Sequence, residues 1–213
     1  MIDYFISADR ELILSLLDEA GIILKYASKE LQGDYSVVFK AVSSDGAALL
    51  YASDELKNNK DIVIEAIYQD GFSIIHASQE IQNNRDYIIL SLSNEGYALQ
   101  FLSANLRDDK DIVSIAVKQN GFALQFASKN MRDNYDVVML AMITEPSALA
   151  DASERLKNNK DILEFYISNC SKENSDNIDL YNECLDKLKI LKENDYLEEN
   201  IPINTNKQRM KKF

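Results

Sequence analysis

The sequence of 213 residues has only two prolines, six glycines, two cysteines and a single histidine. With so little Pro and Gly, no stretch has the composition of a flexible linker, and we expect one continuous folded array. Cys170 and Cys184 are too few for a disulfide framework, which favours a reducing compartment, and no further Cys or His accompanies them to form a zinc site. His76 has no repeated partner that would indicate a metal ligand or a catalyst.

The sequence also lacks a basic N-terminal segment followed by an apolar run, so no secretion signal is recognised. The longest apolar stretch, Leu12 to Leu17, includes Ser15 and is too short to span a membrane. We therefore expect a cytoplasmic protein, or one exported without a cleaved signal peptide, that makes no contact with a membrane.

Charge is unevenly placed along the chain. Residues 1–200 contain all 35 acidic residues and 19 of the 23 basic ones, a balance of −16. Residues 201–213 contain four basic residues and no acid, and this basic tail is predicted to be disordered. So acidic a body repels phosphate backbones, and nucleic acid is therefore not an expected ligand.

What the sequence does have is a repeat of 25 residues. Two series keep this interval, one of glycines and one of serines: Gly21, Gly46, Gly71, Gly96 and Gly121, and Ser28, Ser53, Ser78, Ser103, Ser128 and Ser153. Such a period is typical of a solenoid, in which units too small to fold alone stack on their neighbours. Stacked repeats offer an extended surface, and neither a catalytic constellation nor the ligand spacing of a calcium loop accompanies them. We predict a protein that is not an enzyme and needs no cofactor.

Each repeat is predicted to hold two short α-helices. In the unit that starts at Asp109, the first helix has an apolar stripe of Ile112, Val113, Ala116 and Val117. Asp109 and its equivalents are expected to cap this helix at its N-terminus: Asp9, Asp34, Asn59, Asn84, Asn134 and Asn159. The glycine that follows is expected to end the helix in the left-handed conformation.

The second helix of this unit is predicted from Leu124, Ala127, Ser128 and Met131, which are spaced i, i+3, i+4 and i+7. The repeated serines are predicted to be mostly buried, each bonded to the carbonyl four residues earlier. Pro146 replaces the glycine of the sixth unit, and that corner is expected to differ in shape. A longer helix from about Ile178 to Lys192 is predicted to seal the end of the array with one apolar side: Leu180, Tyr181, Cys184, Leu185, Leu188 and Leu191.

The recurring residues carry a family resemblance. One copy of the pattern runs through Ala123, Leu124, Ala127, Ser128, Met131, Asp136, Val137, Val138 and Ala141. Residues 8 to 168, in which it recurs, resemble the repeat family catalogued as domain of unknown function 4116. The resemblance implies a small helical repeat and brings no established activity or catalytic residues. Three positions depart from the pattern: Ser36, Ser91 and Leu102.

The candidate binding site is a row of mostly aromatic residues two positions before the repeated serines: Tyr26, Tyr51, His76, Phe101 and Phe126, ending at Asp151. Helical phase places this aromatic row nearly opposite the buried stripe, so an accessible strip bounded by acids is one interpretation and a buried row is the other. A second row, one turn earlier, is expected to be core: Ile22, Ala47, Phe72, Tyr97, Phe122 and Ser147.

Together these patterns predict an all-α protein, an α-solenoid of stacked short helix pairs with seven first helices and six second helices. We expect residues 1–170 to form the helical repeat array, 171–200 a C-terminal capping helix and 201–213 the tail. The predicted function is a non-enzymatic protein-binding scaffold, whose protein partner is expected to be basic. The alternative is an acidic inhibitor that mimics nucleic acid and blocks a basic protein; salt dependence of binding would separate the two.

Overall fold

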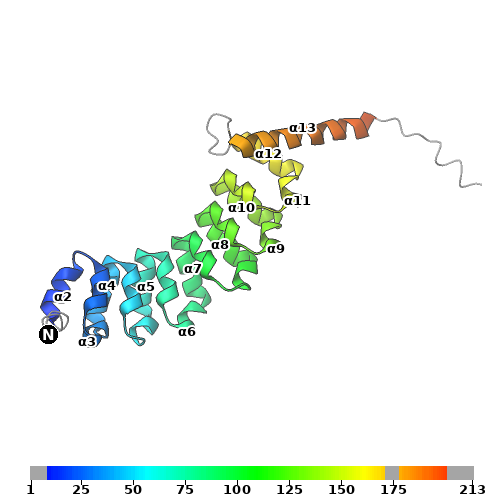
Figure 1. Ribbon diagram of the computed structural model, residues 1–213. Helices are drawn as coiled ribbons and strands as arrows, with labels where there is room; N and C mark the ends of the chain where they lie inside the picture. Colours follow the sequence, from blue (N-terminus) through cyan, green and yellow to red (C-terminus); the bar gives the residue numbers. More distant parts are fainter. Residues whose placement is uncertain (1–8, 171–177, 201–213) are drawn as a thin grey trace, which may run out of the picture. The chain divides into compact units, whose positions relative to one another are not determined.

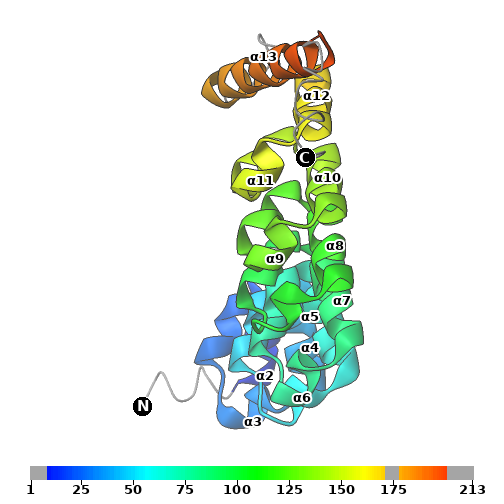
Figure 2. The same cartoon turned by 90° about the vertical axis from the view of Figure 1, so that its right-hand side faces the viewer.

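The computed structural model describes residues 9–170 and 178–200, so the predicted disordered tail lies outside the described residues. The described residues form helices of α and 3-10 type, and the chain divides into two compact units, with the boundary in the sequence between Ala152 and Ser153. In the first unit, successive helices stack in chain order, and both views show this arrangement (Figures 1 and 2). The predicted fold class, an all-α array of repeated helical units, is confirmed.

Each repeat begins with a short α-helix, which we call the A helix. The seven A helices are α2 (Arg10–Leu17), α4 (Tyr35–Ser44), α5 (Lys60–Gln69), α7 (Arg85–Asn94), α8 (Lys110–Gln119), α10 (Tyr135–Thr144) and α12 (Lys160–Asn169). All seven predicted caps are confirmed, because the Asp or Asn before each A helix accepts a hydrogen bond from a backbone N–H of the first turn. Helices this short are marginal alone, and burial between neighbours stabilises them. In α8, Ile112, Val113, Ala116 and Val117 are all buried.

The predicted second helix is wrong in its details, because two shorter elements take its place. The first is a 3-10 helix of six residues: η1 (Gly21–Tyr26), η2 (Gly46–Tyr51), η4 (Gly71–His76), η5 (Gly96–Phe101), η7 (Gly121–Phe126) and η8 (Pro146–Asp151). The second is a single turn: α3 (Lys29–Gln32), η3 (Leu56–Asn58), α6 (Gln79–Gln82), η6 (Leu106–Asp108), α9 (Lys129–Arg132) and α11 (Glu154–Lys157). An extended Ala–Ser pair separates them, with ψ near 160° at both Ala127 and Ser128.

Five of the six repeated serines cap the short helices, and none of the six is buried. The Oγ of Ser128 accepts a hydrogen bond from the backbone N–H of Met131 at 3.1 Å, and Ser28, Ser53, Ser78 and Ser153 make the equivalent bond. Their side chains are half-buried, and Ser103 is exposed. The predicted burial and bond to the carbonyl four residues earlier are therefore corrected. A serine with extended backbone can offer its oxygen to the turn that follows it, and this starts a new helix.

The repeated glycines serve close packing and not left-handed turns, since no described glycine has a positive φ. A Cβ on Gly21 would lie 2.1 Å from the carbonyl oxygen of Ala41 in the next A helix, and one on Gly121 would lie 2.3 Å from that of Ala141. Both distances are far below van der Waals contact. Only glycine lets η1 and η7 approach the neighbouring A helix so closely. Pro146 begins η8, a 3-10 helix of the same length, so the expected change of shape at that corner is also wrong.

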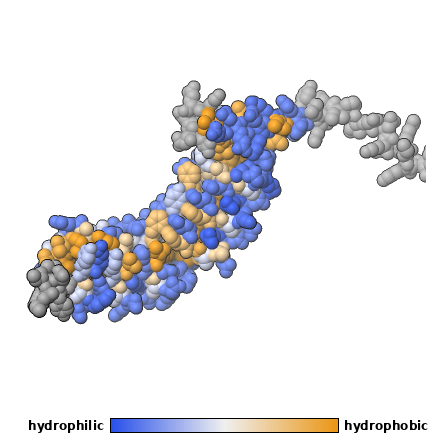
Figure 3. Space-filling model, viewed as in Figure 1, coloured by the Kyte–Doolittle hydropathy of each residue, from blue (hydrophilic) through white to orange (hydrophobic). Residues whose placement is uncertain are grey.

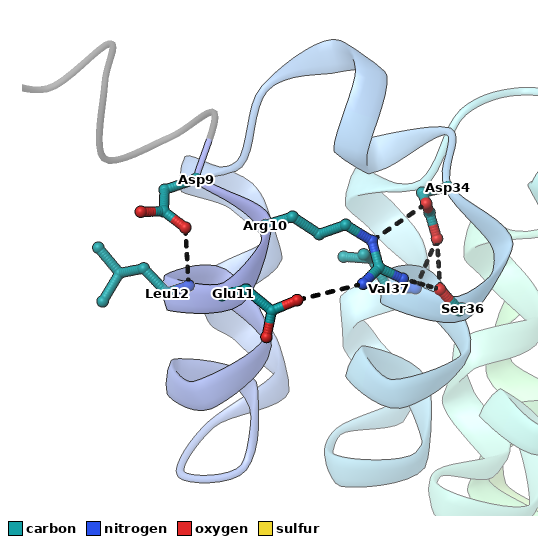
Figure 4. Close-up of polar contacts among 7 residues, drawn as sticks. All are labelled: Asp9, Arg10, Glu11, Leu12, Asp34, Ser36 and Val37. Carbon is teal, nitrogen blue, oxygen red and sulfur yellow. Dashed lines mark hydrogen bonds and ion pairs between the residues drawn. The ribbon is translucent and has the colours of Figure 1, made fainter.

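Polar contacts join the N-terminal ends of neighbouring A helices. Arg10 donates to the Oγ of Ser36 at 2.6 Å and lies 3.5 Å from Asp34, which caps α4 (Figure 4). Ser36 in turn donates to the Asp34 carboxylate at 2.6 Å, and this bond helps to hold the pKa of Asp34 below its usual range. Ser36 departs from the repeat pattern, yet it completes this contact. Arg85 and Asp109 form the same link at 2.9 Å between α7 and α8.

Backbone hydrogen bonds join the short elements of several successive repeats in the first unit. The N–H groups of Ser53, Ser78 and Ser128 donate to carbonyls 21 residues earlier, at Gln32, Lys57 and Arg107, over 2.9, 2.9 and 2.8 Å. Ser103, which follows Leu102, does not make the equivalent bond to Gln82. Leu102 stands where other repeats bury an alanine, and it is only half-buried. The larger side chain does not fit that place, so the third and fourth repeats pack less closely there.

The second unit contains α11, α12 and the long helix α13 (Ile178–Asn200), which confirms the predicted C-terminal helix and extends it. Helix α13 packs against α12 and buries Cys184 and Leu188. Lys192 lies 3.1 Å from Glu164 of α12, and a second ion pair joins Lys160 to Asp195.

Candidate protein-interaction surface

Every residue of the predicted aromatic row ends a 3-10 helix in the first unit. Tyr26 ends η1, Tyr51 ends η2, His76 ends η4, Phe101 ends η5 and Phe126 ends η7. The side chain of Tyr26 is 64% exposed and that of Phe101 is 51% exposed. Tyr51, His76 and Phe126 are half-buried. The row is therefore accessible along its length, and the interpretation that its rings are fully buried is wrong.

Edge-to-face ring pairs hold part of the row in place. The rings of Phe72 and Phe101 lie 5.8 Å apart at 87°, and those of Tyr97 and Phe126 lie 5.7 Å apart at 85°. Each pair joins the second residue of one 3-10 helix to the last residue of the next, so it also stabilises the stacking. The second row, which the sequence placed in the core, is half-buried throughout, so that expectation is wrong, and two of its members, Phe72 and Tyr97, are the ring partners described above.

Two apolar residues that the sequence analysis missed extend this surface. Leu50 is 44% exposed and Ile75 is 36% exposed, and each precedes a member of the aromatic row. A 3-10 helix turns by about 120° per residue, compared with about 100° in an α-helix, so phases calculated for an α-helix misplace these positions. The sequence did contain a signal for these short 3-10 helices. Each begins at a repeated glycine or at Pro146 and ends two residues before a repeated serine, and this spacing leaves room for only six helical residues.

A hollow lies beside Phe101, where the third and fourth repeats pack less closely. It has a volume of about 270 Å³, and its lining combines apolar side chains with amides and a hydroxyl: Ile74, Ile75, Gln79, Gln82, Asn83, Phe101, Leu102, Ser103 and Leu106. The exposed Phe101 and Ile75 belong to this lining. The aromatic row thus runs past a concave apolar surface, which is the kind of place where a partner's side chain can be desolvated.

Lysines lie beside the first two members of the aromatic row, Tyr26 and Tyr51. The Nζ atom of Lys25 lies 4.6 Å from the ring centroid of Tyr26, and a hydrogen bond with Tyr26 raises the pKa of Lys25. Burial, together with the nearby charge of Lys57, lowers the pKa of His76, so His76 is neutral at physiological pH. At its N-terminal end the aromatic row therefore has lysines beside it as well as an acid, Asp54.

Other exposed apolar residues lie on the A helices. Tyr68 on α5 is 64% exposed and Ile143 on α10 is 67% exposed. On the face of the first unit drawn in Figure 3, hydrophobic residues form separate groups between hydrophilic ones. The A-helix surface is thus a second accessible apolar region, and it provides a comparison for the aromatic row.

Within residues 9–170 and 178–200, no three His, Cys, Asp or Glu side chains gather as a metal site would require. Cys170 and Cys184 are free thiols. No helix in this part of the chain is long and apolar enough to cross a membrane. The chemistry that the described surface does present is aromatic and apolar contact, with lysines at one end.

The comparisons with known proteins agree with the repeat structure. The family model described as domain of unknown function (DUF4116) matches residues 9–54, 34–82 and 84–132, three copies that together span more than half of the chain. No curated protein matches the chain, and no solved structure does. The matched copies begin at the capping residues of α2, α4 and α7, which are Asp9, Asp34 and Asn84. The chain therefore belongs to the family of helical repeats described as domain of unknown function 4116.

Proposed function

We propose that this chain is a non-enzymatic, protein-binding scaffold whose partner lies along the aromatic row. The observation that carries the proposal is the exposure of Tyr26 and Phe101, two large aromatic side chains at the same position of different repeats. Aromatic residues dominate the binding energy of many interfaces, and proteins seldom leave extended apolar surface uncovered without a use. Each repeat presents the row position once, about 9 Å from the next, so a partner in extended form can contact several repeats.

The charge of the chain supports a partner that is basic overall. Residues 1–200 carry −16, and such a field speeds encounter with a positively charged protein. The free cysteines suit a reducing compartment, and we place the interaction in the cytoplasm.

The test is affinity capture from a lysate of the source cells, with the bound proteins identified by mass spectrometry. The double variant Tyr26→Ser/Phe101→Ser removes the most exposed members of the row, and Tyr68→Ser/Ile143→Ser removes equally exposed residues from the A helices. We expect the row variant to lose the partners that the wild type and the control variant retain. Thermal melting of all three proteins establishes that they are folded.

Two results would contradict the proposal. If only the A-helix variant loses its partners, the binding surface lies on the A helices. If binding of the captured partner falls steeply with salt and is unchanged by the substitutions in the aromatic row, the chain acts as an acidic mimic of nucleic acid. Salt screens charge pairing but does not screen apolar contact.

A further inference from the structure

A second hollow lies between the first and second repeats, and its lining carries several positive charges. Its volume is about 390 Å³. The first repeat supplies Lys25, Lys29 and Gln32, and the second supplies Leu50, Tyr51, Ala52, Ser53, Asp54 and Lys57. Three lysines and one aspartate therefore line this lysine hollow, on a body whose overall charge is strongly negative.

These three lysines lie close together without an ion pair, whereas other lysines of the first unit are paired with acids. Lys40 lies 2.7 Å from Asp18, and Lys110 lies 2.6 Å from Asp136. Among the residues that the structure describes, neither Lys25 nor Lys29 nor Lys57 lies within ion-pair distance of an acid. Three lysines and one aspartate leave an excess of positive charge in this lining, and an anion between the lysines would balance that excess.

The hollow offers side-chain charges and few free backbone donors. The backbone N–H groups of Ala52, Ser53 and Lys57 already donate to the carbonyls of Leu49, Gln32 and Ser53. Tight phosphate sites usually cradle the anion with several backbone N–H groups, and this lining has those groups engaged. Flexible lysine side chains act as point charges, which suit a carboxylate carried by a longer ligand.

The hollow is also continuous with the aromatic row. Tyr51 belongs to both, and Lys25 lies over the ring of Tyr26. Leu50, at the edge, is exposed and can contact an apolar side chain of the same ligand. A segment of a protein that carries acidic and apolar residues side by side matches this combination of charge and apolar surface.

We propose that the lysine hollow binds a carboxylate side chain from an acidic peptide segment of the partner protein. This inference rests on the proposed function, since it names the chemistry of the partner at the N-terminal end of the aromatic row. The acidic body attracts a partner that is basic overall, and the lysine hollow fixes its register by accepting one acidic segment.

The test uses a defined probe, a fluorescein-labelled peptide of about a dozen residues in which glutamates flank a Leu-Tyr pair, and binding is followed by fluorescence anisotropy. The hollow variant is Lys25→Gln/Lys29→Gln/Lys57→Gln. The matched control, Lys60→Gln/Lys118→Gln/Lys129→Gln, makes the same change of charge at exposed lysines outside the hollow. Thermal melting shows whether each variant is folded.

We expect the glutamate peptide to bind the wild type and the control variant alike, and to bind the hollow variant at least about tenfold more weakly. A peptide with glutamines in place of the glutamates should bind all three proteins much more weakly than the glutamate peptide binds the wild type. Equal loss in both lysine variants would overturn the proposal, because it would show a general charge effect. Absence of binding to the wild type, or equal binding of the glutamine peptide, would also overturn it.

Two further measurements distinguish an acidic segment of the partner from the other possible sources of the anion. Displacement of the peptide by inorganic phosphate at equal concentration would overturn the assignment to a peptide and favour a site for free anions. Self-association of the wild type that the hollow variant lacks, measured by sedimentation, would show that a second copy supplies the acid and would overturn the assignment to a partner. The hollow variant keeps all five residues of the aromatic row. Failure of this inference can therefore be distinguished from failure of the proposed function, which the capture experiment tests.

Discussion

Gly121 at the start of η7 and Ala141 in α10 approach so closely that a Cβ on the glycine would lie 2.3 Å from the alanine carbonyl oxygen. The four other repeated glycines meet the next A helix in the same way. We predict that Gly121→Ala destabilises the protein by about 2 kcal/mol or more, because the backbone on both sides must move apart to relieve the overlap. The melting temperature and denaturant midpoint measure this loss.

Gly33 is the control for this prediction. Its added Cβ would lie 3.5 Å from the nearest atom, the carbonyl oxygen of Glu30, and its backbone is in a region that alanine adopts freely. Gly33→Ala should leave stability unchanged or raise it by up to about 1 kcal/mol. Equal destabilisation by Gly33→Ala and Gly121→Ala would show that glycine acts through backbone freedom and not through close packing.

The second prediction concerns the serine caps. Ser128→Ala removes the oxygen that accepts from the N–H of Met131, so it should cost about 0.5–2 kcal/mol in the free energy of unfolding. Ser103→Ala should cost less than about 0.5 kcal/mol, because Ser103 is exposed and η6 begins without a side-chain cap. Urea unfolding of both variants measures the difference, and similar costs at the two positions would contradict the capping role.

The third prediction concerns the loose contact between the third and fourth repeats. The N–H of Ser103 lacks the bond that the N–H groups of Ser78 and Ser128 make to the preceding repeat, so its hydrogen should exchange with solvent much faster than theirs. Hydrogen-exchange NMR measures each amide separately. Leu102→Ala restores the residue found in the other repeats and should slow exchange at Ser103. Slow exchange at Ser103 in the wild type would contradict this prediction, because it would show that the third and fourth repeats pack as closely as the other repeats.

The A helices could be predicted from the sequence because their signals are local. An Asn or Asp lies directly before each apolar stripe, and both the cap and the stripe depend on residues within one or two turns. The role of the glycines could not be predicted, because it depends on a carbonyl about 20 residues away in the next repeat. A local pattern favoured the left-handed turn, which is the commoner use of a glycine after a helix.

The second helix was mispredicted because two local signals compete there. Leu124, Ala127, Ser128 and Met131 have α-helical spacing, yet Ser128 is also a good N-cap, and the structure uses it as one. The break changes the preceding segment to a 3-10 helix and alters which side chains face outward. The aromatic row was found from its repetition, while the exposed Leu50 and Ile75 beside it depend on that unexpected helix type.

The last prediction concerns the reactivity of the two thiols. Cys184 faces α12 with 2% of its surface exposed, and burial raises the pKa of its thiol to about 11. Because only the thiolate reacts, about 0.1% of Cys184 is reactive at pH 8, and access is restricted as well. Burial also raises the pKa of Cys170, but Cys170 is only half-buried. Iodoacetamide should therefore modify Cys170 first in the folded protein, with the site identified by mass spectrometry.

A pH dependence of stability follows from the raised pKa of Cys184. Burial favours the neutral thiol, so the folded protein retains a proton on Cys184 that the unfolded chain releases from about pH 9 upward. This contribution to stability is complete below pH 9 and is lost as the pH rises toward 11. Cys184→Ala should reduce the loss of stability between these pH values, while Cys170→Ala should change it less. Equal alkylation of both thiols at pH 8 in the folded protein would show that α13 does not cover Cys184 in solution.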